Sequence, residues 1–173
     1  NFPVGIGILG HNNLIGGSRL VGSGPIGQGN VVSGSRQDGI VINLGAHGNL
    51  VIGNVIGLNA AGTQANPNQW DGITINQAPY NTIGSLNPGE DNIISGNAGA
   101  GINLYGYANF GIAVIGNKIG TDITGNLDLG NQGVGLYVES GSTNTLVHGS
   151  LISGNGVAEM YEWEYETDFT VLT

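Results

Sequence analysis

Apolar residues recur along this chain in short alternating runs, each closed by Gly or Asn. The run NLIGG begins at Asn13, NVVSG begins at Asn30 and GIVI begins at Gly39. Such runs are typical of short strands joined by tight corners. Helices are not expected, because each glycine inside a helix costs about 1 kcal/mol and glycines occur every few residues. The pattern therefore predicts an all-β fold.

The three runs return in the same order along the chain. The second set begins at Asn49, Asn54 and Gly72, and the third contains NTIGS, NIISG and GINL. Later sets contain IAVIG, NKIGT and GLYV, and then NTLVH and SLISG. The first runs of successive sets begin 31 to 36 residues apart. Three strands per repeat, stacked about 4.8 Å apart, predict a three-faced β-solenoid of about five coils.

The alternation also assigns aliphatic side chains to the interior of the solenoid. Those of the first face are Ile15, Val51, Ile83, Val114 and Leu146. Those of the second are Val32, Ile56, Ile94, Ile119 and Ile152. Those of the third are Ile40, Ile42, Ile73, Ile75, Ile102, Leu104, Leu136 and Val138. Buried at about 1.5–3 kcal/mol each, these side chains are expected to supply the stability.

Asparagine marks the corners, where it tolerates a left-handed backbone and bonds to stacked copies of itself. One predicted ladder contains Asn13, Asn49, Asn81 and Asn144, and a second contains Asn30, Asn54, Asn92 and Asn117. We expect both ladders to be structural.

Insertions alternate between two corners and comprise residues 18–29, 59–70, 86–91 and 122–132. The full repeat is therefore two coils, or 63 to 68 residues, and such loops often carry binding sites.

Composition limits the partners that this chain can have. The net charge is −9, and the basic residues are Arg19, Arg36 and Lys118. Nucleic acids and anionic membranes need a basic footprint, and a membrane span needs ~20 apolar residues, so neither partner is expected. There is no cysteine for disulfide or thiol chemistry. Because the chain starts at Asn1 and is rich in Asn and Gly, we expect a processed or partial extracellular bacterial protein.

The strings NVVSG, NIISGN, VIGNVIG and IGNKIGTD, with the corner Asn-Thr-Ile-Gly, resemble the right-handed parallel β-helix repeat. That repeat occurs in pectate-lyase-like enzymes and in large secreted bacterial surface proteins. The resemblance covers roughly residues 4–156 and implies a right-handed three-faced parallel β-helix. The variant with GTD after IGNKI is most similar to long secreted or surface proteins. This implies an extracellular setting, often adhesive or carbohydrate-linked, but the fold hosts many activities.

The catalytic clusters of the enzymes that this chain resembles have no evident counterpart here. The lyases use calcium-binding Asp clusters with an Arg or Lys base, and the hydrolases use paired Asp residues. No catalytic residue or cofactor is therefore predicted. Asp38 and Asp71 each precede the glycine that opens a third strand, which stacks them about 5 Å apart. They are either solvated corner carboxylates or a calcium site, which would need further oxygen ligands.

Histidines and aromatic residues give two further candidate sites. His11 and His47 precede the first strands of their coils and are expected to stack, with no third ligand for a metal. Exposed aromatic rings bind sugars or mark protein contacts. The candidates for glycan contact are Trp70, Tyr80, Tyr105 and Tyr107, with Phe110 near by. The threonines fall into no common register, which disfavours an ice-binding face.

The two ends depart from the repeat. We divide the chain into a β-helix, residues 1–159, that starts mid-coil, and a C-terminal aromatic and acidic strand, residues 160–173. This strand either caps its own last coil or pairs with the first coil of another molecule. The second arrangement would build a head-to-tail filament. The candidate self-association residues are Ile6, Ile8, Tyr161, Trp163, Tyr165, Phe169 and Val171.

Two functions follow from these features. The leading hypothesis is a non-enzymatic extracellular structural β-solenoid that associates end to end at a cell surface or in a matrix. The alternative is a carbohydrate-active module, either a polysaccharide-lyase-like enzyme or a glycan-binding or adhesion domain. The negative charge disfavours acidic polysaccharides unless cations are bound.

Overall fold

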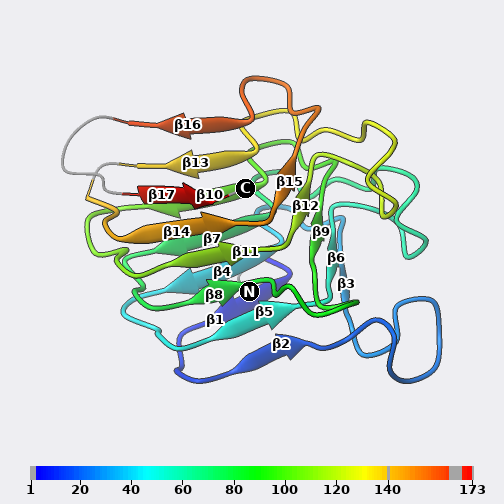
Figure 1. Cartoon of the computed structure of the whole chain (residues 1–173), viewed down its shortest axis with the longest axis horizontal. Coiled ribbons are helices and arrows are strands. Elements are labelled where there is room, and N and C mark those ends of the chain that lie inside the picture. Colours follow the sequence, from blue (N-terminus) through cyan, green and yellow to red (C-terminus); the bar gives the residue numbers. More distant parts are fainter. Residues whose placement is uncertain (1–2, 140, 164–168, 173) are drawn as a thin grey trace.

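The strands of this protein form three parallel sheets, as the computed structural model shows (Figure 1). The structure describes residues 3–139, 141–163 and 169–172. Sheet A contains β1 (Ile6–Ile8), β4 (Ile40–Asn43), β7 (Ile73–Asn76), β10 (Ile102–Tyr105), β13 (Leu136–Val138) and β16 (Met160–Glu162). Sheet B contains β2 (Leu14–Gly16), β5 (Leu50–Ile52), β8 (Thr82–Ile83), β11 (Ala113–Ile115), β14 (Thr145–His148) and β17 (Phe169–Leu172). Sheet C contains β3 (Val31–Val32), β6 (Val55–Ile56), β9 (Ile93–Ile94), β12 (Lys118–Ile119) and β15 (Leu151–Ile152).

Successive strands belong to sheets B, C and A in turn, so each group of three makes one coil. Five such coils run from β2 to β16, flanked by β1 in sheet A and β17 in sheet B. This order confirms the predicted three-faced parallel β-solenoid of about five coils. No described segment forms a helix long and apolar enough to cross a membrane.

The interior is a column of aliphatic side chains, and the predicted inward positions occupy it with one exception. Val114 pairs with Val147 and Ala113 with Leu146, so Val147 points inward and Leu146 does not. The predicted inward position of Leu146 is therefore wrong. The cause is Asn144, which takes a left-handed turn conformation at φ 53°, as Gly111 does at φ 66° in the preceding coil. The strand consequently starts one residue later than the motif suggests.

Asparagine ladders hold the corners together. Asn49 bonds to Asn13 and Asn81 at 2.8 and 2.9 Å, but the exposed Asn144 does not continue this ladder. The second predicted ladder is complete, with amide-to-amide bonds of 2.9–3.0 Å through Asn30, Asn54, Asn92 and Asn117. A third ladder, which was not predicted, runs at 2.8–2.9 Å through Asn68, Asn97, Asn131 and Asn155. The inner members of each ladder thus satisfy buried groups of the neighbouring coils.

The insertion loops cover the outer side of sheet C. Val55, Leu58 and Ile93 are fully buried there, under Ile26, Ile123 and Leu129, in a second hydrophobic cluster. An antiparallel bridge closes each of the loops 59–70 and 122–132 at its base, Leu58 with Ala65 and Thr121 with Asp128. The loops are therefore packed structural elements, and they hide this face of the solenoid from a large ligand.

An ion cluster ties three coils together beside these loops. Asp91 forms salt bridges to Arg19 at 2.5 Å and to Lys118 at 2.6 Å, and all three side chains are largely buried. Arg19 also donates to the backbone carbonyl of Asp91. Two of the three basic side chains are thereby committed to one carboxylate.

In its described residues, 160–163 and 169–172, the C-terminal segment contains two short strands rather than the single strand that we expected. β16 pairs with β13 in sheet A, and β17 pairs with β14 in sheet B. Both strands therefore continue the sheets of their own chain. Tyr165 lies outside the described residues, and only the backbone of Phe169 is described.

Candidate functional site

The outer face of sheet A carries both polar and aromatic side chains. Strand residues alternate between the core and the solvent, so register places outward residues of successive coils in rows. The first row contains Gly7, Val41, Thr74, Asn103, Tyr137 and Tyr161. A second row contains Asn43, Asn76 and Tyr105, and Glu139 and Trp163 directly follow β13 and β16. Six strands give this face a length of about 24 Å.

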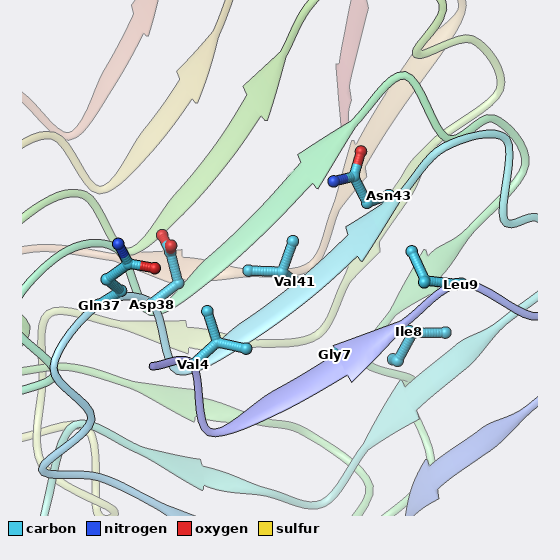
Figure 2. A pocket seen from close by; sticks show the side chains of 8 residues that line it. All are labelled: Val4, Gly7, Ile8, Leu9, Gln37, Asp38, Val41 and Asn43. Carbon is cyan, nitrogen blue, oxygen red and sulfur yellow. The ribbon is translucent and has the colours of Figure 1, made fainter. Parts of the chain in front are cut away.

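A hollow opens this face over β1 and β4 (Figure 2). Its volume is about 420 Å³, and it lies where Gly7 has no side chain between Val4 and Val41. Figure 2 shows Gln37 and Asp38 at one end of the hollow and Leu9 and Asn43 at the other. One carboxyl group of the site therefore borders a cavity that a ligand group can enter.

Asp38 and Asp71 lie together, as their stacking predicted, and Thr74 links them. Its hydroxyl oxygen is 2.8 Å from Asp38 Oδ1 and 3.3 Å from Asp71 Oδ2, so its single proton is donated mainly to Asp38. Asp71 also accepts bonds from the Ala100 amide at 2.6 Å and from Asn103 Nδ2 at 3.1 Å. These donors hold Asp71 in place on the outer face.

The electrostatics of the pair favour a proton on Asp38. Burial raises the pKa of Asp38, the Thr74 hydrogen bond partly lowers it, and the negative charge of Asp71 raises it further. In the described part of the chain, no three His, Cys, Asp or Glu side chains are grouped to hold a metal ion. Two carboxylates fall short of the six or more oxygens that calcium prefers, so calcium binding here stays a prediction.

Aromatic rings gather at the β13 and β16 end of the same face. Tyr137 and Tyr161 meet edge to face, with ring centroids 5.6 Å apart. Tyr105 and Trp163 lie in the neighbouring row and are about half exposed, at 50% and 56%. Burial, together with the charge of Glu139, raises the pKa of the Tyr137 hydroxyl. We call Tyr105, Tyr137, Tyr161 and Trp163 the aromatic platform.

Between the carboxylates and the aromatic platform lie two acceptors without donors. The side-chain oxygens of Asn76 and Asn103 are buried and accept no hydrogen bond from the described residues. A buried acceptor without a partner costs about 1–3 kcal/mol, and both oxygens are shielded from solvent, so they weaken the stability of this face rather than present themselves at its surface. Near by, burial raises the pKa of Glu139, and the charge of Asp71 adds to the effect.

The structure separates the residues that we proposed for glycan contact. Tyr105 lies on the outer face of sheet A, whereas Trp70 lies in the corner before β7. Tyr80 packs edge to face on Phe110 at 4.9 Å, in the corner between sheets A and B. Tyr107, in the same corner, is 81% exposed. His11 and His47 stack as expected, with centroids 4.1 Å apart.

The candidate self-association residues also lie in different parts of the structure. Ile8 is buried in the core and Ile6 packs against it, while Tyr161 and Trp163 belong to the aromatic platform. Sequence reasoning placed neither Tyr137 nor Glu139 in a site. Alignment of GLYV with GINL and GITI would have revealed Tyr137, because it puts this residue level with Asn103 and Thr74.

Comparison with known proteins supports the fold. No protein-family model matches the chain, and no curated protein does. Crystal structures of a single and a double mutant of the periplasmic alginate epimerase AlgG match 98% of the chain with a TM-score of 0.67. The chain is a right-handed parallel β-helix. It spans 36% of the AlgG chain at 17–18% sequence identity, a likeness that shows the fold alone.

Proposed function

We propose that this protein is a glycan-binding β-helix module whose binding surface is the outer face of sheet A. The observation that carries the proposal is the arrangement on one face of carboxylates, a hollow beside Asp38 and the aromatic platform. Sugar rings stack on exposed aromatic side chains, and their hydroxyl groups donate to fixed acceptors. A long face of this kind suits an extended polymer.

The other faces support this choice by contrast. The loops cover sheet C, so its outer side presents no comparable surface. The outer side of sheet B carries Leu14, Leu50, Thr82, Ala113 and Leu146, which offer few hydrogen-bonding groups. The similarity in fold to a periplasmic enzyme that acts on alginate agrees with a carbohydrate ligand and with a location outside the cytoplasm.

Affinity electrophoresis against neutral, amino-bearing and uronate polysaccharides tests the proposal. We expect at least one class to bind, and the double variant Tyr161→Ala with Trp163→Ala to weaken that binding about tenfold, equivalent to about 1.4 kcal/mol. Tyr107→Ala is the matched control, because this ring is exposed but lies at another corner. Failure to bind any class, or equal effects of both changes, would contradict the proposal.

A second candidate function is structural self-association at the end formed by β15, β16 and β17. Val147, Ile152, Met160 and Leu172 line an apolar hollow of about 460 Å³ there. β15 is also an edge of sheet C among the described strands. Light scattering at rising protein concentration tests this function. We expect growth in size that Leu172→Lys prevents, and a constant monomeric mass would refute it.

A further inference from the structure

Charged side chains are missing from the strands of sheet B and from most of the corners that lead into them. None of its six described strands contains Asp, Glu, Lys or Arg. The same holds for the four corners that lead from sheet A into β2, β5, β8 and β11, which are residues 9–13, 44–49, 77–81 and 106–112. The carboxylates of Asp38, Asp71 and Glu139 lie instead on sheet A, and Asp122 and Asp128 lie on a loop beside sheet C. One face of the solenoid is therefore uncharged over five coils.

The outward side chains of this uncharged sheet are mostly apolar. The strands β2, β5, β8, β11 and β14 lie side by side (Figure 1). Their register forms one outward row, which contains Leu14, Leu50, Thr82, Ala113 and Leu146. Leu14 is 61% exposed, and the other four side chains are partly exposed.

Two further groups widen this apolar surface. The rings of Tyr80 and Phe110 pack edge to face in the corner just before β8 and β11, and both are exposed. Leu86, also exposed, lies beside Gly116 and Gly149, which directly follow β11 and β14. We call the whole surface the sheet B face, which contains Leu14, Leu50, Tyr80, Thr82, Leu86, Phe110, Ala113 and Leu146. A continuous exposed apolar surface of this kind marks an interaction site.

The distribution of charge indicates which partner fits the sheet B face. A strongly charged partner gains nothing from it, because it offers no ion pair. Two copies of this chain, each with a net charge of −9, repel one another over long distances. Their repulsion is smallest when they meet through the uncharged face, since sheet A carries carboxylates and loops cover sheet C. The favoured partner is therefore a second copy.

The area of the sheet B face is sufficient for a weak dimer. Six strands span about 24 Å, and six residues from the corner to the end of a strand span about 20 Å. Two copies would bury about 1,000 Å² in total, which is the lower limit for specific interfaces. We therefore expect a dissociation constant on the order of 10 µM.

We infer that two copies of this chain pair through the sheet B face and form a closed two-fold dimer. A two-fold axis parallel to the strands sets the large Leu14 and Leu50 of one copy over the smaller Ala113 and Thr82 of the other. Sheets packed in this way lie about 10 Å apart. A two-fold contact occupies this face of both copies, so assembly stops at two. The dimer does not depend on glycan binding, and its surface differs from the end formed by β15, β16 and β17.

Sedimentation equilibrium over about 1–300 µM tests the inference, because this range spans the expected dissociation constant. The mean mass should rise from 17.6 kDa and level off at twice that value. Leu14→Glu places an unpaired carboxylate in the interface and should weaken dimerisation at least about tenfold. Leu127→Glu is the matched control, because Leu127 is 60% exposed on a loop beside sheet C, and it should leave dimerisation unchanged.

Chemical cross-linking tests the same contact without a disruptive charge. The chain has no cysteine, so one introduced thiol is the sole target of a maleimide cross-linker of about 10 Å reach. Thr82→Cys, at the centre of the face, should yield cross-linked dimers. Thr63→Cys, exposed on a loop beside sheet C, is the matched control and should yield none.

Several results would overturn the inference. A constant mass of 17.6 kDa, or equal effects of Leu14→Glu and Leu127→Glu, excludes pairing through the sheet B face. Growth beyond two copies that Leu172→Lys prevents assigns association to the end of the solenoid instead. A monomer that floats with vesicles of zwitterionic phosphatidylcholine assigns the face to a lipid surface. Cross-linking through Thr63→Cys but not Thr82→Cys places the contact beside sheet C.

Discussion

The substitution Asn92→Ala tests whether the asparagine ladders hold the solenoid together. Asn92 is fully buried, and its side chain makes four hydrogen bonds. Its oxygen accepts from the backbone and side chain of Asn54, and its nitrogen donates to Val51 and Asn117. Removing the amide leaves the buried Asn54 backbone N–H without its acceptor.

The expected cost follows from these contacts. An orphaned buried donor costs about 1–3 kcal/mol, and each lost hydrogen bond contributes about 1 kcal/mol net. The Val51 carbonyl keeps a bond from Gly84 and the Asn117 oxygen keeps the Asn92 backbone N–H, so not every loss counts in full. We therefore expect the free energy of unfolding to fall by about 3–4 kcal/mol, a shift in Tm on the order of 10 °C.

Urea denaturation followed by circular dichroism measures this change. The matched control is Asn144→Gly, at the position where the sequence predicts a ladder member but the structure has an exposed turn with φ 53°. Glycine adopts that conformation freely, so the control should stay within about 0.5 kcal/mol of the parent. Equal effects of the two substitutions, or a loss below 1 kcal/mol for Asn92→Ala, would refute the reasoning.

Three further predictions concern charged groups. Asp91→Ala should lower the unfolding free energy by about 2–3 kcal/mol, between the values for exposed and buried ion pairs, as urea denaturation at low salt will measure. Asp122 has its pKa lowered to about 2 by backbone hydrogen bonds, chiefly from Leu127. Its contribution to stability is therefore complete above the ordinary value of 3.8 and lost as the pH falls towards 2, so melting curves of Asp122→Asn and the parent should converge over that range. Asp38 has a raised pKa, so its ionised form costs stability at neutral pH. Asp38→Asn should therefore melt higher than the parent at pH 7, and this advantage should vanish as acid protonates Asp38; a lower Tm at pH 7 would contradict the assignment.

Most of the fold was predictable because glycine and asparagine recur between the short apolar runs of every coil. The inward aliphatic positions follow from the alternation of inward and outward residues along each strand. Loops of different lengths between the strands do not change this alternation. Asn144 misled the assignment because asparagine suits both a ladder and a left-handed turn, and only the pairing register separates the two. The third ladder did carry a signal: Asn68, Asn97 and Asn131 each precede by four residues the glycine that opens a strand of sheet A.

The candidate site was less predictable than the fold. Asp38 and Asp71 could be paired from their common place before a strand, and the structure adds the Thr74 bridge between them. Tyr105 and Tyr137 could be placed from the sequence, but their meeting with Tyr161 and Trp163 could not, because the sequence predicts one separate strand over residues 160–173. Only the pairing of β16 with β13 puts Tyr161 beside Tyr137 on the acidic face. The Asp91 cluster joins residues of three coils and depends on how the loops fold back.

Tryptophan fluorescence tests the central claim, that a glycan binds on the outer face of sheet A. The chain has two tryptophans of similar exposure, Trp163 at 56% on the aromatic platform and Trp70 at 54% in the corner before β7. Trp70→Phe leaves only the first as a reporter, and Trp163→Phe leaves only the second. Titration with the tightest-binding glycan should change the emission of the variant that retains Trp163 and leave the other unchanged. A response only from Trp70, or from neither residue, would contradict the account.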